Sequence, residues 1–119
     1  MGTYILYLKT SETIRLTISE QEIIIGKGYY LYVGSAFGTG GLTSRLHRHL
    51  RKKKKPHWHI DQMTMSPFCS VQGVAVFLNE KIECQIAKKL SYIDKVSSIE
   101  NVGNSDCKNG CYSHFFKIE

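Results

Sequence analysis

The sequence predicts a small α/β protein of the α+β type, in which a mixed, mainly antiparallel sheet is flanked by helices. Several short runs rich in β-branched and aromatic residues alternate between apolar and polar positions, which is typical of strands. Two later stretches repeat apolar residues every four positions, which is typical of amphipathic helices. A chain of 119 residues is long enough to bury one core, so residues 1–119 are expected to form a single domain.

Six stretches are expected to form strands. The clearest alternation runs through residues 13–18, where isoleucine and leucine take every second position and polar residues take the others. Residues 71–78 are apolar almost throughout, which predicts a strand covered on both faces of the sheet. The expected strands are Thr3–Leu8, Thr13–Ile18, Ile23–Ile25, Tyr29–Val33, Val71–Leu78 and Tyr112–Ile118.

Two helices are expected between the later strands. The first begins near Leu42 and ends before Pro56, because proline cannot continue a helix. The second runs from Glu80 to Ile93. Their apolar stripes consist of Leu42, Leu46 and Leu50 in the first helix and of Ile82, Ile86, Leu90 and Ile93 in the second. Residues 57–65 allow a further short helix.

Positive charge is concentrated in one short segment. The formal net charge is +6, and seven of the 16 lysines and arginines lie between Arg45 and Lys55. A basic face attracts polyanions, among which nucleic acid is the commonest. The alternative is a solvated helix end whose lysines favour the helix dipole. The residues expected to contact nucleic acid are Arg48, Arg51, Lys52, Lys53, His57 and His59.

The same composition indicates a cytoplasmic protein without a membrane span. No apolar run approaches the length needed to cross a bilayer, and the first residues lack the layout of a signal peptide. The four cysteines are then expected to be reduced. Cys107, Cys111 and His114 are possible ligands of zinc, but their spacing departs from the usual Cys-x2-Cys knuckle, so simple packing is favoured.

Three side chains on the expected helices suit chemistry on a phosphate. Arg45 and His49 lie one helical turn apart at the edge of the apolar stripe. The alternative for each is structural, with the arginine stem lying over the core. Glu83 falls about 100° from Ile82, inside the second apolar arc. Burying a carboxylate requires a compensating partner, which is either a metal ion or an arginine such as Arg45.

The glycine-rich segment and the histidine-rich segment each allow two interpretations. Residues 35–41 lead directly into the first helix, where glycines and free backbone N–H groups suit an anion. A tight strand-to-helix turn explains the glycines equally well. In a strand, His57, His59 and Asp61 would share a face near phosphate, whereas Trp58 and Ile60 could equally be core residues.

Two tyrosine motifs complete a resemblance to a known family. Gly2-Thr3-Tyr4 and Tyr32-Val33-Gly34 resemble the two signature motifs of the GIY-YIG nuclease superfamily, with threonine and valine in place of isoleucine. Arg45, followed one turn later by His49, is similar to the next motif of that superfamily. Glu83 opens a stretch similar to its metal-binding Glu-x-x-Leu-Ile motif. The resemblance runs in order through the chain, and looks closest to a compact branch with Pro-His-Trp-His-Ile-Asp and Ser-Asp-Cys elements.

The resemblance implies a divalent-metal-dependent endonuclease that hydrolyses phosphodiester bonds in DNA or RNA. Tyr4, assisted by Tyr32 and His49, would take a proton from the attacking water. Arg45 would hold the phosphate oxygens, and Glu83 would bind one Mg²⁺ or Mn²⁺ ion. A non-catalytic nucleic-acid-binding module of the same fold is the alternative. The asparagine that the superfamily places after the glutamate has no clear counterpart, and the position of Tyr4 near the N-terminus makes it depend on sheet pairing.

Overall fold

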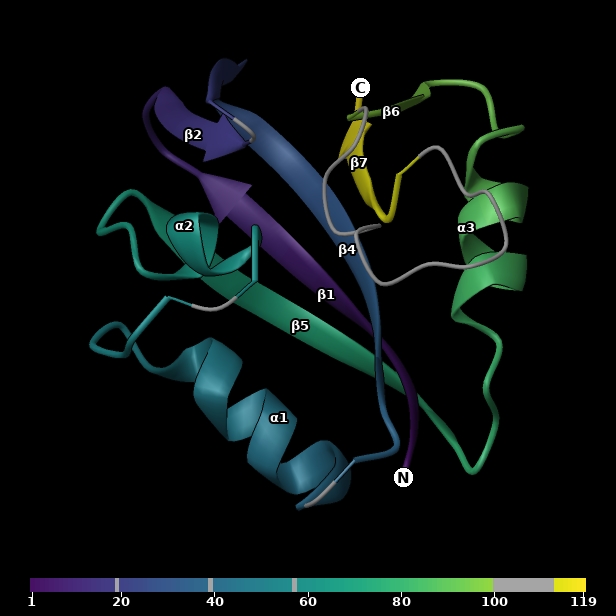
Figure 1. Ribbon diagram of the computed structural model, residues 1–119. Coiled ribbons are helices and arrows are strands. Elements are labelled where there is room, and N and C mark those ends of the chain that lie inside the picture. The colour runs from purple at the N-terminus through teal and green to yellow at the C-terminus, as the bar shows by residue number, and fades with distance from the viewer. Residues whose placement is uncertain (19, 39, 57, 100–112) are drawn as a thin grey trace.

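The computed structural model describes residues 1–18, 20–38, 40–56, 58–99 and 113–119. Its centre is a five-stranded antiparallel sheet, and a separate two-stranded hairpin packs against it (Figure 1). In spatial order the sheet contains β5 (Cys69–Leu78), β1 (Gly2–Thr10), β4 (Gly28–Ala36), β7 (Phe115–Ile118) and β6 (Val96–Ser98). The hairpin consists of β2 (Ile14–Ile18) and β3 (Gln21–Ile25). The predicted α+β class with a mainly antiparallel sheet is confirmed.

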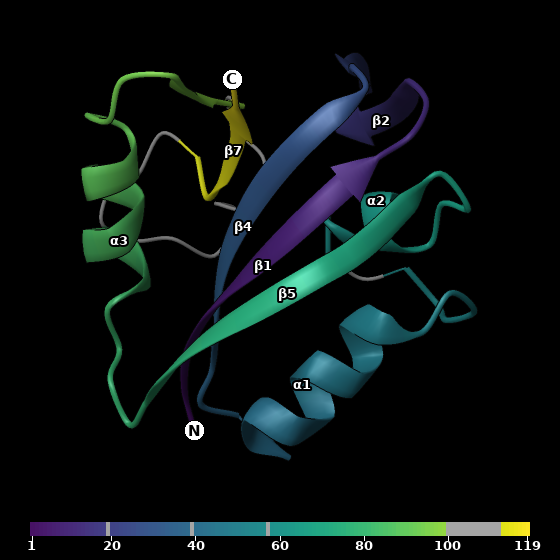
Figure 2. The ribbon, with the colours of Figure 1, turned by 180° about the vertical axis from the view of Figure 1, so that it is seen from behind.

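Helices cover the two faces of the sheet unequally. Helix α1 (Gly41–Leu50) and the short helix α2 (Asp61–Thr64) lie on the same side as the hairpin. Helix α3 (Glu83–Leu90) lies on the opposite side, as the front and back views show (Figures 1 and 2). The larger core forms on the α1 side, and a smaller one lies beneath α3.

The central position of β1 secures Tyr4. This strand pairs with β4 on one side and with β5 on the other, and Tyr4 lies opposite both Gly34 and Val76. Strand pairing on both sides satisfies the backbone N–H and C=O groups that would otherwise fray near a chain end. Tyr4 is therefore buried although it is the fourth residue of the chain.

Strand β5 differs from its prediction. It lies at the edge of the sheet, and three of its apolar residues are largely exposed: Val74 and Val76 at 41% and Leu78 at 68%. The prediction of a strand covered on both faces is therefore wrong. An apolar run shows that a stretch favours β structure, but it does not show which strands will become its neighbours.

Both predicted helices form, with altered boundaries or faces. Helix α3 begins at Glu83 and ends at Leu90, so it is shorter than predicted at both ends. In α1, Leu50 is 57% exposed, whereas His49 is buried. His49 lies only about 20° from Leu42 on a helical projection, and Leu50 about 80° away, which explains why the histidine takes the core position.

Several predicted boundaries extend or shift by a few residues. The predicted strands at 3–8 and 29–33 lengthen into β1 and β4, and the short β6 was not predicted. The described part of the last strand begins at Phe115, while Tyr112 lies outside the described residues. Within the parts of the chain that the structure describes, no helix is long and apolar enough to cross a membrane.

Candidate active site

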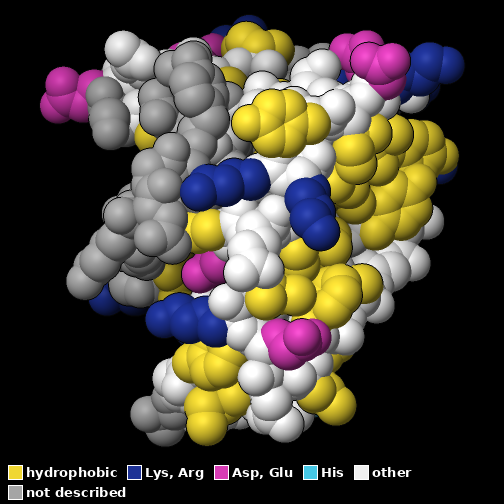
Figure 3. Space-filling model, turned by 90° about the vertical axis from the view of Figure 1, so that its right-hand side faces the viewer, with side chains coloured by type: hydrophobic (Ala, Val, Ile, Leu, Met, Phe, Trp, Pro, Cys, Tyr) yellow, Lys and Arg dark blue, Asp and Glu magenta, His cyan; other side chains and the backbone are white. Residues whose placement is uncertain are grey.

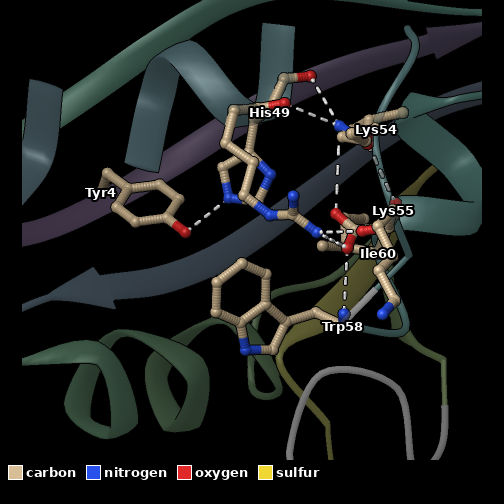
Figure 4. Close-up of polar contacts among 9 residues, drawn as sticks. Tyr4, His49, Lys54, Lys55, Trp58 and Ile60 are labelled. Atoms are coloured by element: carbon tan, nitrogen blue, oxygen red, sulfur yellow. Dashed lines mark hydrogen bonds and ion pairs between the residues drawn. The ribbon is translucent and has the colours of Figure 1, made fainter. Parts of the chain in front are cut away.

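Tyr4, Tyr32 and His49 form an aromatic cluster between the sheet and α1. Tyr4 lies on β1, Tyr32 lies on β4, and their ring centroids are 6.4 Å apart. The His49 ring, on α1, lies 5.4 Å from the Tyr4 ring and 5.9 Å from the Tyr32 ring. The Tyr4 hydroxyl and His49 Nε2 form a hydrogen bond of 2.7 Å, which Figure 4 shows reaching from the strand to the helix.

Gly34 makes room for the Tyr4 side chain. A Cβ atom at this position would lie only 2.5 Å from the Tyr4 hydroxyl oxygen. Gly34 lies directly opposite Tyr4 in the β1–β4 pairing, so any side chain there would occupy the same face. The glycine of the Tyr32-Val33-Gly34 motif therefore has a steric role in placing the tyrosine hydroxyl against His49.

Burial keeps this tyrosine–histidine pair neutral. It raises the pKa of Tyr4 to about 12, although the nearby Arg45 charge opposes the rise. Burial, together with the Lys54 charge, lowers the pKa of His49 to about 4. Burial also raises the pKa of Tyr32 well above its usual value. Near pH 7 the imidazole is therefore neutral and its Nε2 atom can accept the Tyr4 proton, while Nδ1 finds no hydrogen-bond partner among the described residues.

The buried imidazole predicts a loss of stability in acid. An unfolded histidine titrates near about 6.5, and His49 titrates at about 4 in the folded protein. The unfolded chain therefore binds more protons than the folded chain between these values, so the free energy of unfolding falls as pH drops through this window. His49 alone accounts for a loss of about 3 kcal/mol by pH 4 and for no loss above about pH 7.

Urea unfolding at pH 7, 5.5 and 4.5 measures this effect. The His49→Gln variant should lack the histidine's share of the acid destabilisation, so the difference between variant and wild type should shrink as pH falls. His47→Gln is the matched control, because His47 is an exposed histidine on the same helix. A difference between His49→Gln and wild type that stays constant over this range would contradict a buried neutral imidazole.

Arg45 and Glu83 are joined through Ser35. The Arg45 Nη1 group donates a hydrogen bond of 2.9 Å to the backbone carbonyl of Ser35. The Ser35 hydroxyl donates one of 3.0 Å to Glu83 Oε1. Trp58 stacks against the Arg45 guanidinium, which lies 4.3 Å from the centre of its ring. Arginine and carboxylate are thus held by the same residue at the end of β4.

Glu83 lies at the boundary between core and solvent. Its side chain is 23% exposed, and it occupies the first turn of α3, where the helix dipole favours a negative charge. Its second oxygen lies 3.7 Å from Nδ1 of His114, a neighbour that the sequence did not predict. The Glu83 charge raises the pKa of both Tyr4 and Tyr32. The carboxylate therefore acts electrostatically on the aromatic cluster, and the five predicted catalytic residues share one region.

A buried carboxylate at Asp61 organises the wall beside this site. Its Oδ2 atom accepts a hydrogen bond of 2.6 Å from Arg48 Nη2 and one of 3.0 Å from the backbone N–H of Trp58. The Lys54 ammonium, whose side chain is 1% exposed, lies 3.9 Å from Oδ1. Trp58 also faces the Arg48 guanidinium at 5.0 Å. Asp61 thereby fixes the tryptophan on which Arg45 rests. Figure 4 shows the Trp58 side chain below the Tyr4–His49 pair.

The residues expected to bind nucleic acid divide into engaged and exposed groups. Arg48 is held by Asp61 and by the Lys55 carbonyl, and Lys52 donates to backbone carbonyls in the segment 66–69. Of the others, Arg51 and Lys53 are exposed, His59 is half-buried, and His57 lies outside the described residues. The engagement of Arg48 was not foreseen, because nothing in the sequence signals that Asp61 approaches α1.

Comparison with known proteins shows to which family this chain belongs. The family described as "Domain of unknown function DUF123" matches residues 3–119. The chain belongs to the DUF123 family. No curated protein and no solved structure matches it. The description of the DUF123 family carries no activity, so a function for this chain must be argued from the site itself.

The carboxylate oxygens of Glu83 are suitable ligands for a hard, hydrated cation such as Mg²⁺. Among the described residues, no group of three or more His, Cys, Asp and Glu side chains is arranged to hold a metal ion. Mg²⁺ needs no such cage, since it keeps several waters and binds through one or two carboxylates plus substrate phosphate. The Glu83 carboxylate, whose side chain is 23% exposed, meets that requirement. For zinc, Cys84 lies 3.8 Å from His114, while Cys107 and Cys111 lie outside the described residues.

Proposed function

We propose that this DUF123 chain is a divalent-metal-dependent nuclease of the GIY-YIG type, which hydrolyses phosphodiester bonds in DNA or RNA. The observation that carries the proposal is the 2.7 Å hydrogen bond between Tyr4 and a buried neutral His49, beside an arginine and a carboxylate held by Ser35. This combination offers a proton acceptor, a cation for phosphate oxygens and a metal ligand, which are three components that metal-assisted hydrolysis of a phosphodiester can use.

Tyr4 acts as a proton relay rather than as a standing base. With a pKa of about 12, only about one Tyr4 in 10⁵ is ionised at pH 7. The hydrogen bond to His49 offers another route, in which Tyr4 takes a proton from the attacking water as it passes its own proton to Nε2. Because burial lowers the pKa of His49 to about 4, the negative charge of a bound phosphate would be needed to stabilise the imidazolium that forms. The water oxygen then bonds to phosphorus, and the bond from phosphorus to the leaving oxygen breaks. His49 ends the step as an imidazolium.

Arg45 and Glu83 stabilise the charge that develops during this step. The Arg45 guanidinium is half-buried and pre-oriented by Ser35 and Trp58, so little side-chain entropy is lost when it binds phosphate oxygens. Glu83 would hold one Mg²⁺ or Mn²⁺ ion, which would supply Lewis-acid stabilisation of the leaving oxygen. Tyr32 packs beside the relay and helps to exclude water from it.

The experiment is a cleavage assay with labelled single-stranded, duplex and branched DNA and RNA in Mg²⁺, with EDTA as the metal-free control. Arg45→Ala is expected to lower the rate by about 10²- to 10³-fold, because removing one preorganised donor to a developing oxyanion has an effect of that size. Arg15→Ala is the matched control, since Arg15 is an exposed arginine on the hairpin. Equal cleavage by wild type and Arg45→Ala would overturn the proposal.

A non-catalytic nucleic-acid-binding module is the second candidate, and the exposed Arg51 and Lys53 next to α1 favour it. Such binding weakens steeply as salt rises, because phosphate contacts release counterions. Salt-sensitive binding without cleavage of any substrate in Mg²⁺ or Mn²⁺ would support this candidate over the nuclease.

A further inference from the structure

The α3 side of the sheet carries an exposed aromatic surface that the proposed catalytic site does not use. Helix α3 packs over Val33 and Phe116, at one part of this face. Further along the same face of the sheet, Tyr7 of β1 and Tyr29 of β4 are 37% and 41% exposed. Figure 3 views the molecule from the α3 side and shows hydrophobic side chains gathered into a broad patch, with Lys and Arg side chains beside it.

The two tyrosines form a stack accompanied by a cation. Their ring centroids are 5.7 Å apart and their planes differ by 17°. Lys9 lies opposite Tyr29 in the β1–β4 pairing, and its ammonium lies 5.9 Å from the centre of the Tyr29 ring. The five strands of the sheet contain no aspartate or glutamate. The surface therefore combines flat π faces with positive charge.

Gly73 leaves open space next to this stack. It lies opposite Tyr7 on β5, on the side of Tyr7 away from β4. A Cβ atom added there would meet no described atom within 4 Å, and the backbone of Gly73 does not have a positive φ angle. Neither crowding nor conformation therefore requires glycine at this position. A glycine within a strand weakens the sheet, and it often marks a bulge or a place where a ligand approaches closely. The β1–β5 pairing shifts register directly next to Gly73, between Tyr7 and Leu8, and the open space lies over the same position.

We propose that Tyr7, Tyr29 and Gly73 bind an unpaired nucleobase of single-stranded DNA or RNA. The base extends the two-ring stack over Gly73, and Lys9 contacts an adjacent phosphate. Base–aromatic stacking tolerates any sequence because every base presents a π face, and a nearby cation follows the backbone. The inference rests on the nucleic-acid substrate of the proposed function but not on cleavage. This surface lies on the face of the sheet opposite to His49.

The test fills the open space without altering either tyrosine. In EDTA, binding of a labelled mixed-sequence single strand of DNA or RNA is measured by fluorescence anisotropy at low and high salt. Gly73→Val is expected to weaken binding by about tenfold or more, as the loss of one stacked base does, and by the same factor at both salt concentrations. Val74→Ile, which adds a methyl group to the other face of β5, is the matched control and should bind like wild type.

Further variants separate stacking from charge. Tyr7→Phe should retain binding and Tyr7→Ala should lose it, while Lys9→Gln should reduce the dependence of binding on salt. A blunt-ended duplex of the same sequence should be insensitive to Gly73→Val, because its bases are already stacked on one another. Thermal unfolding checks that the valine leaves the fold intact.

Single-strand binding by Gly73→Val that equals wild type would overturn the inference. If the self-association of this variant then also changes in sedimentation, the face is a contact between copies of the chain. Binding is measured here in EDTA and cleavage is measured in Mg²⁺, so a failure of the nuclease proposal and a failure of this one give different results.

Discussion

Replacing Glu83 by glutamine is expected to lower the rate of phosphodiester cleavage in Mg²⁺ by about 10³-fold, equivalent to about 4 kcal/mol of transition-state stabilisation. Glutamine keeps an oxygen that can accept the hydrogen bond from the Ser35 hydroxyl, so the local packing is preserved. What it removes is the negative charge that would hold a divalent cation. The loss should therefore appear in the rate of cleavage and in metal affinity, while stability changes little.

Two further measurements make this expectation specific. Glu80→Gln is the matched control, because Glu80 is an exposed glutamate three residues earlier and should leave the rate unchanged. Removing the Glu83 charge should also lower the pKa of Tyr4, since that charge raises it. Loss of a metal ligand predicts a rate about 10³-fold lower. If Glu83→Gln instead cleaves at a rate within about threefold of wild type, Glu83 has no part in the mechanism.

The largest effect on stability is expected at Asp61. Its carboxylate is fully buried between Arg48 and Lys54, and the Lys54 side chain is almost completely enclosed. Asp61→Ala would leave that ammonium buried without its anion, and breaking such a pair costs about 3–5 kcal/mol. The burial that already lowers the pKa of Lys54 would then act without the opposing charge of Asp61. Urea unfolding at pH 7 measures the loss.

A matched control and a compensating variant separate this effect from simple truncation. Asp94→Ala removes an exposed aspartate and should change the free energy of unfolding by less than about 0.5 kcal/mol. Adding Lys54→Met to Asp61→Ala should recover part of the loss, because the uncompensated ammonium is then absent. An Asp61→Ala protein as stable as Asp94→Ala would show that the buried network contributes nothing to stability.

The sequence was most informative where local pattern decides structure. Alternating residues predicted β2, and the four-residue repeat predicted α1, since both depend on neighbours along the chain. The edge position of β5 was missed because strand order depends on the whole topology. The burial of His49 in place of Leu50 follows from helical angles that were available, but only the position of the sheet shows which side of α1 is covered.

The residues of the candidate site could be predicted from the sequence, but most of the contacts between them could not. Tyr4, Tyr32, Arg45, His49 and Glu83 could be nominated from their motifs, and the structure brings them to one region. The link between Arg45 and Glu83 could not be predicted, because it passes through the backbone carbonyl of Ser35, which any residue would provide. The roles of Asp61 and Trp58 were also missed, since contacts between α1 and residues 58–61, at the start of α2, leave no periodic signal.

The position of bound Mn²⁺ is the most direct measurement of the central claim, that Glu83 holds a divalent cation beside the Tyr4–His49 pair. Crystals soaked in Mn²⁺ and measured for anomalous scattering locate the ion independently of activity. The proposed mechanism predicts one ion coordinated by the Glu83 carboxylate and by water, on the side of Glu83 that faces Arg45 and Tyr4. Manganese bound elsewhere, with none at Glu83 when the soak is saturating, would contradict it.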